Sequence, residues 1–158
     1  MINVEKRRAI VAHCRALCGT PWVHQGRLPV LGLDCIGVAI EATKAAGEWT
    51  PEVAAQVPDN YGRIPHNNNF YKFLNRVMSP IAEKDKLIGD LALICWRSYT
   101  MHIGVLSDKL RDGSVTGPFS LIHALANFKR VDEQIFDPKF MVVHGYYRFP
   151  GLAAEEAA

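Results

Sequence analysis

Cys35 stands where a cysteine can act as a nucleophile, between Asp34 and the apolar run IGVAI. Asp34 is a residue type that caps helix N-termini, so Cys35 would occupy the first turn of a helix. The free backbone N–H groups and the dipole of such a turn favour a thiolate and lower the pKa of a cysteine. The negative charge of Asp34 opposes this effect. We therefore expect a cationic partner, and a histidine would serve as both counter-ion and general base.

Two histidines in strand-like segments are candidates for that partner. In MHIGVLS, His102 shares a strand face with Gly104, whose missing side chain would let a helix end approach the imidazole. In FSLIHALA, His123 alternates with leucines on one face of a strand. If the two strands are neighbours, His123 can hydrogen-bond to His102 and fix its tautomer. The predicted catalytic residues are therefore Cys35 as nucleophile, His102 as base and His123 as orienting residue.

A structural interpretation of these residue types stays open, because single buried cysteines and strand histidines usually belong to the core. Cys14 and Cys18 lie four residues apart on a predicted helix, and with His13 and His24 they imitate a metal site. Structural zinc sites, however, usually pair their ligands across a tight Cys-x-x-Cys turn, which this sequence lacks. Four scattered cysteines are also too few for a disulfide scaffold in 158 residues. We predict neither a metal nor another cofactor.

Composition excludes several classes of protein. The chain is 49% hydrophobic and 22% charged, with a net charge of +2, and its one tight basic cluster, residues 6–8, falls in a predicted helix. These values argue against a nucleic-acid partner. No apolar run approaches the ~20 residues of a membrane span, so no membrane partner is expected. The N-terminal MINVEKRRAIVAHC has no small-residue cleavage site after its short apolar stretch, so we expect synthesis in the cytoplasm without a signal peptide.

The order of predicted elements indicates an α+β fold. Apolar spacing predicts a helix over residues 4–17, capped by Asn3, and a central helix over residues 35–46 that is apolar on nearly every side. Strand-like segments follow at residues 91–97, 101–107, 119–125, 131–136 and 141–149. Helices followed by strands favour an antiparallel sheet of about five strands, on which the nucleophile helix would pack. We predict one domain over residues 1–150 and a flexible tail over 151–158.

Five motifs together resemble the NlpC-type family of cysteine peptidases, papain-like enzymes that cut bacterial cell-wall peptides. They are a Gly-Thr-Pro-aromatic segment, an Asp-Cys-x-Gly helix start, a Gly-Asp-Leu strand start, a His-x-Gly strand and a third polar residue. In this sequence they fall on residues 19–22, 34–37, 89–91, 102–104 and on His123. The resemblance covers residues 4–150. The HQGR loop and the closing YRFP resemble the branch of the family that occurs in phage tails and related particles.

The resemblance implies a papain-like fold and hydrolysis of peptidoglycan stem peptides between γ-D-glutamate and the diamino acid. It gives Cys35, His102 and His123 their catalytic roles, and it makes Trp22, Asp34 and His24 candidates for binding the substrate. Two positions depart from the family pattern, since Ile36 replaces the usual Ser and Trp22 the usual Tyr. The implied partners are stem peptides and other tail proteins, and the absent signal peptide fits delivery by a tail or related particle.

Two other functions use the same residues and stay open. A papain-like domain at a tail tip can be a non-catalytic structural or binding module, although such a member would normally have lost the cysteine or the histidine. A thioesterase or acyltransferase needs the same dyad but a lipid-lined cleft. The sequence leaves the accepted cross-bridge, the host and the oligomeric state open.

Overall fold

The two predicted N-terminal helices form, and each begins at a side-chain cap. Helix α1 covers Val4–Ala16, and Asn3 accepts the Lys6 N–H at 3.0 Å. Helix α2 covers Cys35–Ala45 and is capped by Asp34. The computed structural model describes residues 1–62, 68–96, 100–108, 112–137, 139 and 141–158. None of the helices in these ranges is long and apolar enough to cross a membrane.

The strands build one six-stranded antiparallel sheet in the order β3-β8-β4-β5-β6-β7. All five predicted strands form within one or two residues of their expected ends. The sixth strand, β3, was not predicted and pairs with the end of β8 at the edge of the sheet. The bounds are β3 Ser79–Ile81, β4 Leu91–Trp96, β5 Thr100–Asp108, β6 Phe119–Leu125, β7 Arg130–Ile135 and β8 Met141–Arg148.

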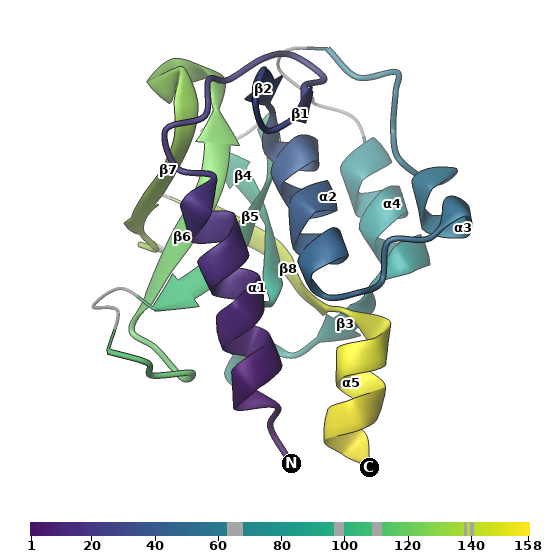
Figure 1. The fold of residues 1–158 in the computed structure, drawn as a ribbon, viewed down its shortest axis with the longest axis vertical. Helices are drawn as coiled ribbons and strands as arrows, with labels where there is room; N and C mark the ends of the chain where they lie inside the picture. The colour runs from purple at the N-terminus through teal and green to yellow at the C-terminus, as the bar shows by residue number, and fades with distance from the viewer. Residues whose placement is uncertain (63–67, 97–99, 109–111, 138, 140) are drawn as a thin grey trace.

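A two-stranded hairpin and two short helices precede the six-stranded sheet in the sequence. A two-stranded hairpin, β1 Arg27–Leu28 and β2 Gly32–Leu33, lies beyond the N-terminal end of α2 (Figure 1). Two short helices follow α2, namely α3 Pro51–Ala54 and α4 Asn69–Val77. No predicted element lies directly after α2, so α3 is an addition to the predicted elements.

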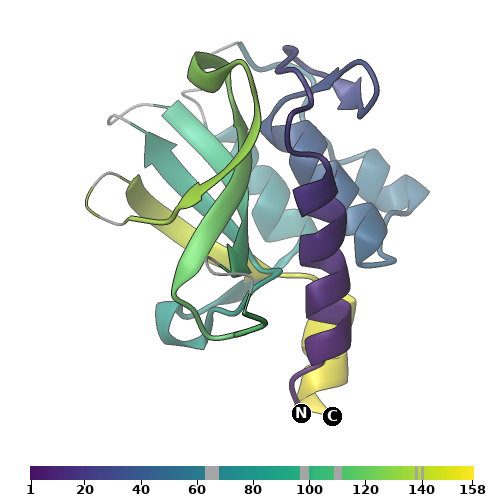
Figure 2. The same cartoon turned by 60° about the vertical axis from the view of Figure 1, so that its left-hand side comes forward.

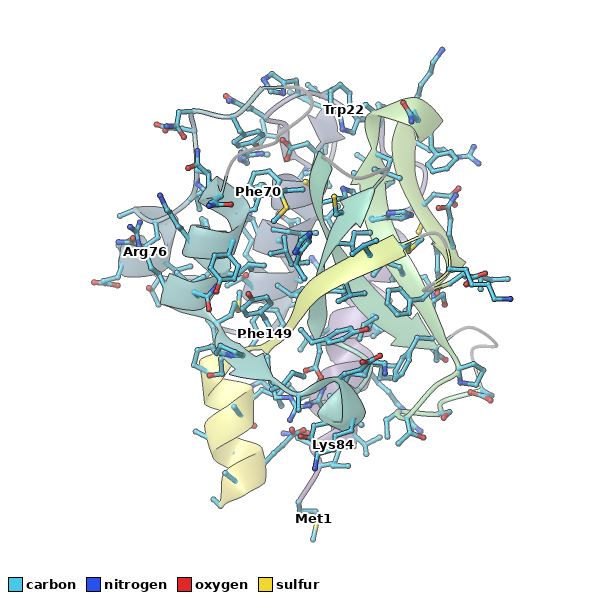
Figure 3. The ribbon with its side chains drawn as sticks, turned by 180° about the vertical axis from the view of Figure 1, so that it is seen from behind. Met1, Trp22, Phe70, Arg76, Lys84 and Phe149 are labelled. Carbon is cyan, nitrogen blue, oxygen red and sulfur yellow. The ribbon has the colours of Figure 1, made fainter. Side chains whose placement is uncertain are left out.

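The sheet is curved, and the helices cover one of its faces. Helices α1 and α2 pack side by side against β5 and β6 (Figures 1 and 2), and the strands come to the front when the molecule is seen from behind (Figure 3). The main core fills the space between helices and sheet. All residues from 35 to 43 in α2 are buried, as the sequence predicted for a central helix. A second, smaller cluster lies on the opposite sheet face, formed by Ala92, Ile94, Leu106, Leu121, Met141 and Tyr146.

The C-terminal residues differ from the prediction of a flexible tail over 151–158. They form helix α5, Pro150–Ala157, which follows β8 directly. Leu152 is fully buried, and the Glu156 carboxylate binds the buried Arg7 guanidinium at 2.7 and 2.8 Å. The physical reason is that Arg7 has no exposed surface and needs anionic partners, one of which α5 supplies. Alanine-rich composition also favours a helix there.

Candidate active site

The first turn of α2 holds Cys35 because Asp34 caps it. The Asp34 Oδ1 atom accepts the Gly37 N–H at 2.9 Å, as the sequence predicted for an N-cap. Position 37 must be glycine because the loop that leads into β1 passes very close to the helix. A Cβ atom there would lie 2.4 Å from the carbonyl oxygen of Gly26. The Asp-Cys-x-Gly motif thus brings loop and helix start together.

The Cys35 thiol is nearly buried, with 7% of the residue exposed. Burial raises the pKa of this thiol to about 12, and the neighbouring Asp34 charge acts in the same direction. The backbone N–H of Ile103 and the positive charge of Arg27 lower the pKa, but less. The helix start was expected to lower the thiol pKa and Asp34 to oppose that effect, and in the structure burial adds to Asp34 and outweighs the lowering contributions. In the free protein the thiol is protonated at neutral pH.

Strand β5 can direct a backbone group at Cys35 because it separates from β6 at this end. In the described residues, β5 pairs with β6 only from Val105 to Asp108. The N–H of Ile103, two residues before this pairing starts, is instead directed at the Cys35 sulfur. The start of α2 therefore lies at the point where β5 leaves β6, next to the backbone of the predicted base strand.

The two predicted histidines are in contact. The distance between His102 Nε2 and His123 Nδ1 is 2.8 Å, and both rings are buried. Burial lowers the pKa of His123 to about 4. The pKa of His102 lies well below its ordinary value because of burial and the proximity of His123. Both imidazoles are consequently neutral at pH 7.

Gly104 has a different role from the predicted one. It was expected to make room for a helix end beside His102, but a Cβ atom at position 104 would lie 2.5 Å from Cγ of Leu121. The Leu121 side chain on the adjacent strand β6 fills the space. Gly104 thus allows two strands to pack rather than the nucleophile helix to approach.

A residue that sequence reasoning missed extends the histidine pair. Gln134 in β7 places its Oε1 atom 2.9 Å from Nε2 of His123. In the sheet register, His123 lies opposite Asp132, and Gln134 lies two residues further along the same face. The alternation of RVDEQI carries this signal, but it can be used only once β6 and β7 are known to be neighbours. The structure therefore places three side chains in line, Gln134, His123 and His102.

No hydrogen bond joins the Cys35 thiol to the His102 ring in the described part of the chain. There His102 has one ring partner, at Nε2, and its Nδ1 atom has none. The geometry thus brings Cys35 to the strand that carries His102 and leaves one nitrogen of the base available. It does not include the preformed thiolate–imidazolium pair that a fully activated cysteine would need.

Asp34 was predicted to bind substrate as well as cap α2, and the structure fills its oxygens from within the chain. Oδ1 accepts from the Gly37 N–H and from Arg27 Nη1 at 2.7 Å. Oδ2 accepts from the Gln25 N–H at 3.0 Å and from the Tyr61 hydroxyl at 2.5 Å. The residue is 3% exposed. This saturation supports the capping role and leaves no free acceptor direction for a substrate amine.

Trp22 and His24, the other predicted substrate residues, precede α2 in the sequence. Their rings belong to a row of aromatic rings. The rings of Trp22 and His24 have centroids 6.3 Å apart, and His24 stands edge-on to Tyr61 at 5.7 Å. Tyr61 in turn packs edge-on against Phe70. Trp22 and His24 are half-buried, and Trp22 lies at the end of the molecule opposite Met1 and Lys84 (Figure 3). Their role in binding substrate stays a prediction.

Potential metal ligands do not gather in the described residues, where no group of three or more His, Cys, Asp or Glu side chains could hold an ion. None of the four cysteines takes part in a disulfide in the described residues. The candidate chemistry considered for these residues is that of Cys35 and the histidine pair.

Comparison with protein-family models and with curated proteins gives no match to this sequence. Solved structures do match. RipD from Mycobacterium tuberculosis, described as a non-catalytic NlpC/p60 domain protein adapted to peptidoglycan binding, has a TM-score of 0.54 and 15% identity, and the match covers 90% of this chain and 96% of RipD.

The second structure is a protein from Staphylococcus aureus described as similar to a lipoprotein of the NLP/P60 family. It has a TM-score of 0.54 and 16% identity over 92% of this chain, which spans only 41% of the staphylococcal protein. The fold is that of an NlpC/p60 domain. The predicted α+β, papain-like architecture is thereby confirmed, while identities of this size leave activity open.

Proposed function

We propose that the chain is a cysteine peptidase that hydrolyses amide bonds in peptidoglycan stem peptides, at the bond between γ-D-glutamate and the diamino acid. The observation that carries the proposal is the buried line from Gln134 through His123 to His102, which ends beside the strand backbone that faces Cys35. The NlpC/p60 fold and the resemblance of the sequence motifs support the substrate class.

The mechanism follows from the neutral resting state. His102 takes the proton from the Cys35 sulfur at Nδ1 as the substrate carbonyl approaches, and the thiolate attacks the carbonyl carbon. The backbone N–H of Cys35, at the start of α2, stabilises the oxyanion that forms. His102 then returns its proton to the leaving amine, and the amine departs. Water hydrolyses the thioester, and the thiol is regenerated.

The test is cleavage of a synthetic L-alanyl-γ-D-glutamyl-diamino acid peptide, followed by mass spectrometry of both products. The wild-type protein should release the diamino acid amine, and Cys35→Ala should release none while its circular dichroism spectrum is unchanged. Cys18→Ala, which alters an exposed thiol just after α1, is the matched control and should keep full activity. Hydrolysis above background by Cys35→Ala would contradict the proposal.

A second candidate is a non-catalytic module that binds peptidoglycan. It is favoured by the raised pKa of Cys35 and by the lack, in the described residues, of a hydrogen bond between this thiol and His102. RipD, which shares the fold, is described as such a protein. Sedimentation with purified peptidoglycan separates the two, since binding without cleavage by the wild-type protein favours the module. Cleavage of an acyl thioester in preference to the peptide would instead favour the thioesterase or acyltransferase.

We also propose that the domain acts as part of a phage tail or a related particle. Support comes from the HQGR loop and the closing YRFP segment, which resemble the particle-associated branch of the family. Mass spectrometry of purified particles from a producing strain would detect the chain in stoichiometric amounts. Its absence from such particles, with activity present in the cell lysate, would remove this part of the proposal.

A further inference from the structure

Gln134 is a polar side chain that contacts the histidine pair from the neighbouring strand. It lies in β7, where side chains alternate between the two sheet faces. Its neighbour Glu133 faces the helices and binds Arg15 of α1 at 2.9 Å, whereas Gln134 faces the other way and binds His123. Strand β7 therefore supplies an ion-pair partner to helix α1 and a neutral hydrogen-bond partner to the neighbouring strand β6.

The order of donors and acceptors follows from the atom that Gln134 presents. Its amide is placed with the carbonyl oxygen Oε1 toward the ring, and because this atom accepts, we assign the His123 proton to Nε2. A neutral imidazole has one N–H, so Nδ1 of His123 is an acceptor. Nε2 of His102, 2.8 Å away, must then donate to it. The same rule leaves Nδ1 of His102 with a free lone pair.

We propose that Gln134 is a positioning residue that, acting through His123, holds the proton of His102 on Nε2 and so keeps Nδ1 as the base for Cys35. The inference rests on the proposed peptidase function and adds a residue and a directional role to it. His102 would otherwise be free to carry its proton on either nitrogen, and a ring protonated at Nδ1 cannot accept the thiol proton.

The neutral amide suits this role better than a carboxylate would. Burial keeps His123 uncharged, with a pKa of about 4, although the hydrogen bond to Gln134 and the charge of Asp132 act in the opposite direction. The titratable groups beside His123 are His102 on β5 and Asp132 on β7. A second carboxylate at position 134 would favour the imidazolium form. His123 would then donate from both nitrogens, which would reverse the bond to His102 and move the His102 proton to Nδ1.

The first experiment reads the tautomers without any substrate. Long-range ¹H–¹⁵N spectra of ring-labelled protein at pH 7 should show Nε2 protonated and Nδ1 unprotonated in both His102 and His123. In Gln134→Leu the two rings should lose this fixed pattern and show averaged nitrogen shifts. The matched control is Ile135→Ala, the next residue of β7, which is 58% exposed and points to the opposite face. It should leave the ring spectra unchanged.

The second experiment follows the pH profile of peptide cleavage. Gln134→Leu should lower kcat/KM about 10- to 100-fold, the usual effect of removing a partner that orients an imidazole, mainly through kcat. Gln134→Glu keeps an acceptor, but the acidic limb of its profile should move up by about 1 to 3 pH units because His123 protonates earlier. A purely structural role would not move that limb.

The outcomes separate this inference from the proposed function. A His102 proton on Nδ1 in the wild-type protein, or ring spectra that Gln134→Leu leaves unchanged, would overturn the inference whatever the activity. The expected tautomers in a protein that cleaves no stem peptide would support the positioning role and overturn the peptidase function. An acidic limb that stays in place in Gln134→Glu would also count against the inference.

Discussion

Two buried polar clusters lie in different parts of the molecule, and only one of them leaves a reactive group unsatisfied. The ion cluster near the chain ends consists of Arg7, Asp90, Arg148 and Glu156. Arg7 binds Asp90 at 3.0 Å and Glu156 at 2.7 Å, and Arg148 binds Asp90 at 2.8 Å. Two cations meet two anions, and the cluster joins α1, the start of β4, β8 and α5. Its groups satisfy one another.

The cluster at the start of α2 is arranged differently. Asp34 is saturated like the ions of the first cluster, but the histidine line ends in a nitrogen of His102 that has no partner in the described residues. Buried polar density alone therefore does not distinguish the candidate site from a structural cluster, whereas a ring nitrogen without a partner in the described residues does. Asp90 illustrates the point, because it belongs to a family motif yet its side-chain partners are Arg7, Arg148 and the Leu87 N–H.

The largest effect on stability is expected from breaking the ion cluster. Arg7→Leu leaves the buried Asp90 and Glu156 carboxylates without one of their cations, and should lower the free energy of unfolding by about 3–5 kcal/mol. Urea denaturation measures this difference. Arg8→Leu is the control, because Arg8 is exposed and, among the residues that the structure describes, its side chain has a single hydrogen bond, to the Gly113 carbonyl. Equal losses in both variants would mean that the buried cluster is not special.

A somewhat smaller effect should come from titrating the histidine line. His123 has a pKa of about 4 when folded and about 6.5 when unfolded, so the unfolded chain binds more protons between these values. Stability is complete above about pH 6.5 and should fall by roughly 3 kcal/mol as the pH drops to about 4.

The difference in unfolding free energy between wild type and His123→Asn, followed over this range, isolates the contribution of His123 from that of the carboxylates. The same comparison for Ile135→Ala, an exposed residue with no titratable side chain, serves as the control and should stay nearly flat. A constant difference for His123→Asn would show that the pKa of His123 is the same in the folded and the unfolded protein, and would contradict the prediction.

The smallest effect is expected at the saturated carboxylate of the site cluster. Tyr61→Phe removes one of four hydrogen bonds to Asp34 and leaves the helix cap to Gly37 intact. We expect a loss of about 1–3 kcal/mol in the free energy of unfolding. Tyr71→Phe, which alters an exposed tyrosine on α4, should cost less than about 0.5 kcal/mol. A negligible effect of Tyr61→Phe would mean that solvent readily replaces the hydroxyl.

Local patterns in the sequence were enough for the two long N-terminal helices, their caps and five of the six strands of the large sheet. Asn3 and Asp34 cap their helices because capping depends on residues within three positions, and the five predicted strands follow from alternation and turn residues. The contact between His102 and His123 was predicted only on the condition that β5 and β6 are neighbours, which the structure meets.

Contacts between distant segments were beyond the sequence. Gln134 depends on the register between β6 and β7, and the order of α5 depends on Arg7, about 150 positions away along the chain. The raised pKa of Cys35 has the same origin, because it reflects how deeply the packed chain buries the helix start. Each of these features is set by tertiary packing rather than by neighbouring residues.

The two chain ends lie side by side, where the N-terminal ammonium of Met1 donates to the Glu156 carbonyl at 2.9 Å (Figures 1 and 2). A pulling force applied through both ends would therefore act first on the contacts between α5 and α1 and would break them one after another. The ion pair between Arg7 and Glu156 would give the main resistance to this force. The sheet and the start of α2 would carry no tension until that ion pair breaks. A domain tethered at both ends would therefore keep mechanical strain away from Cys35.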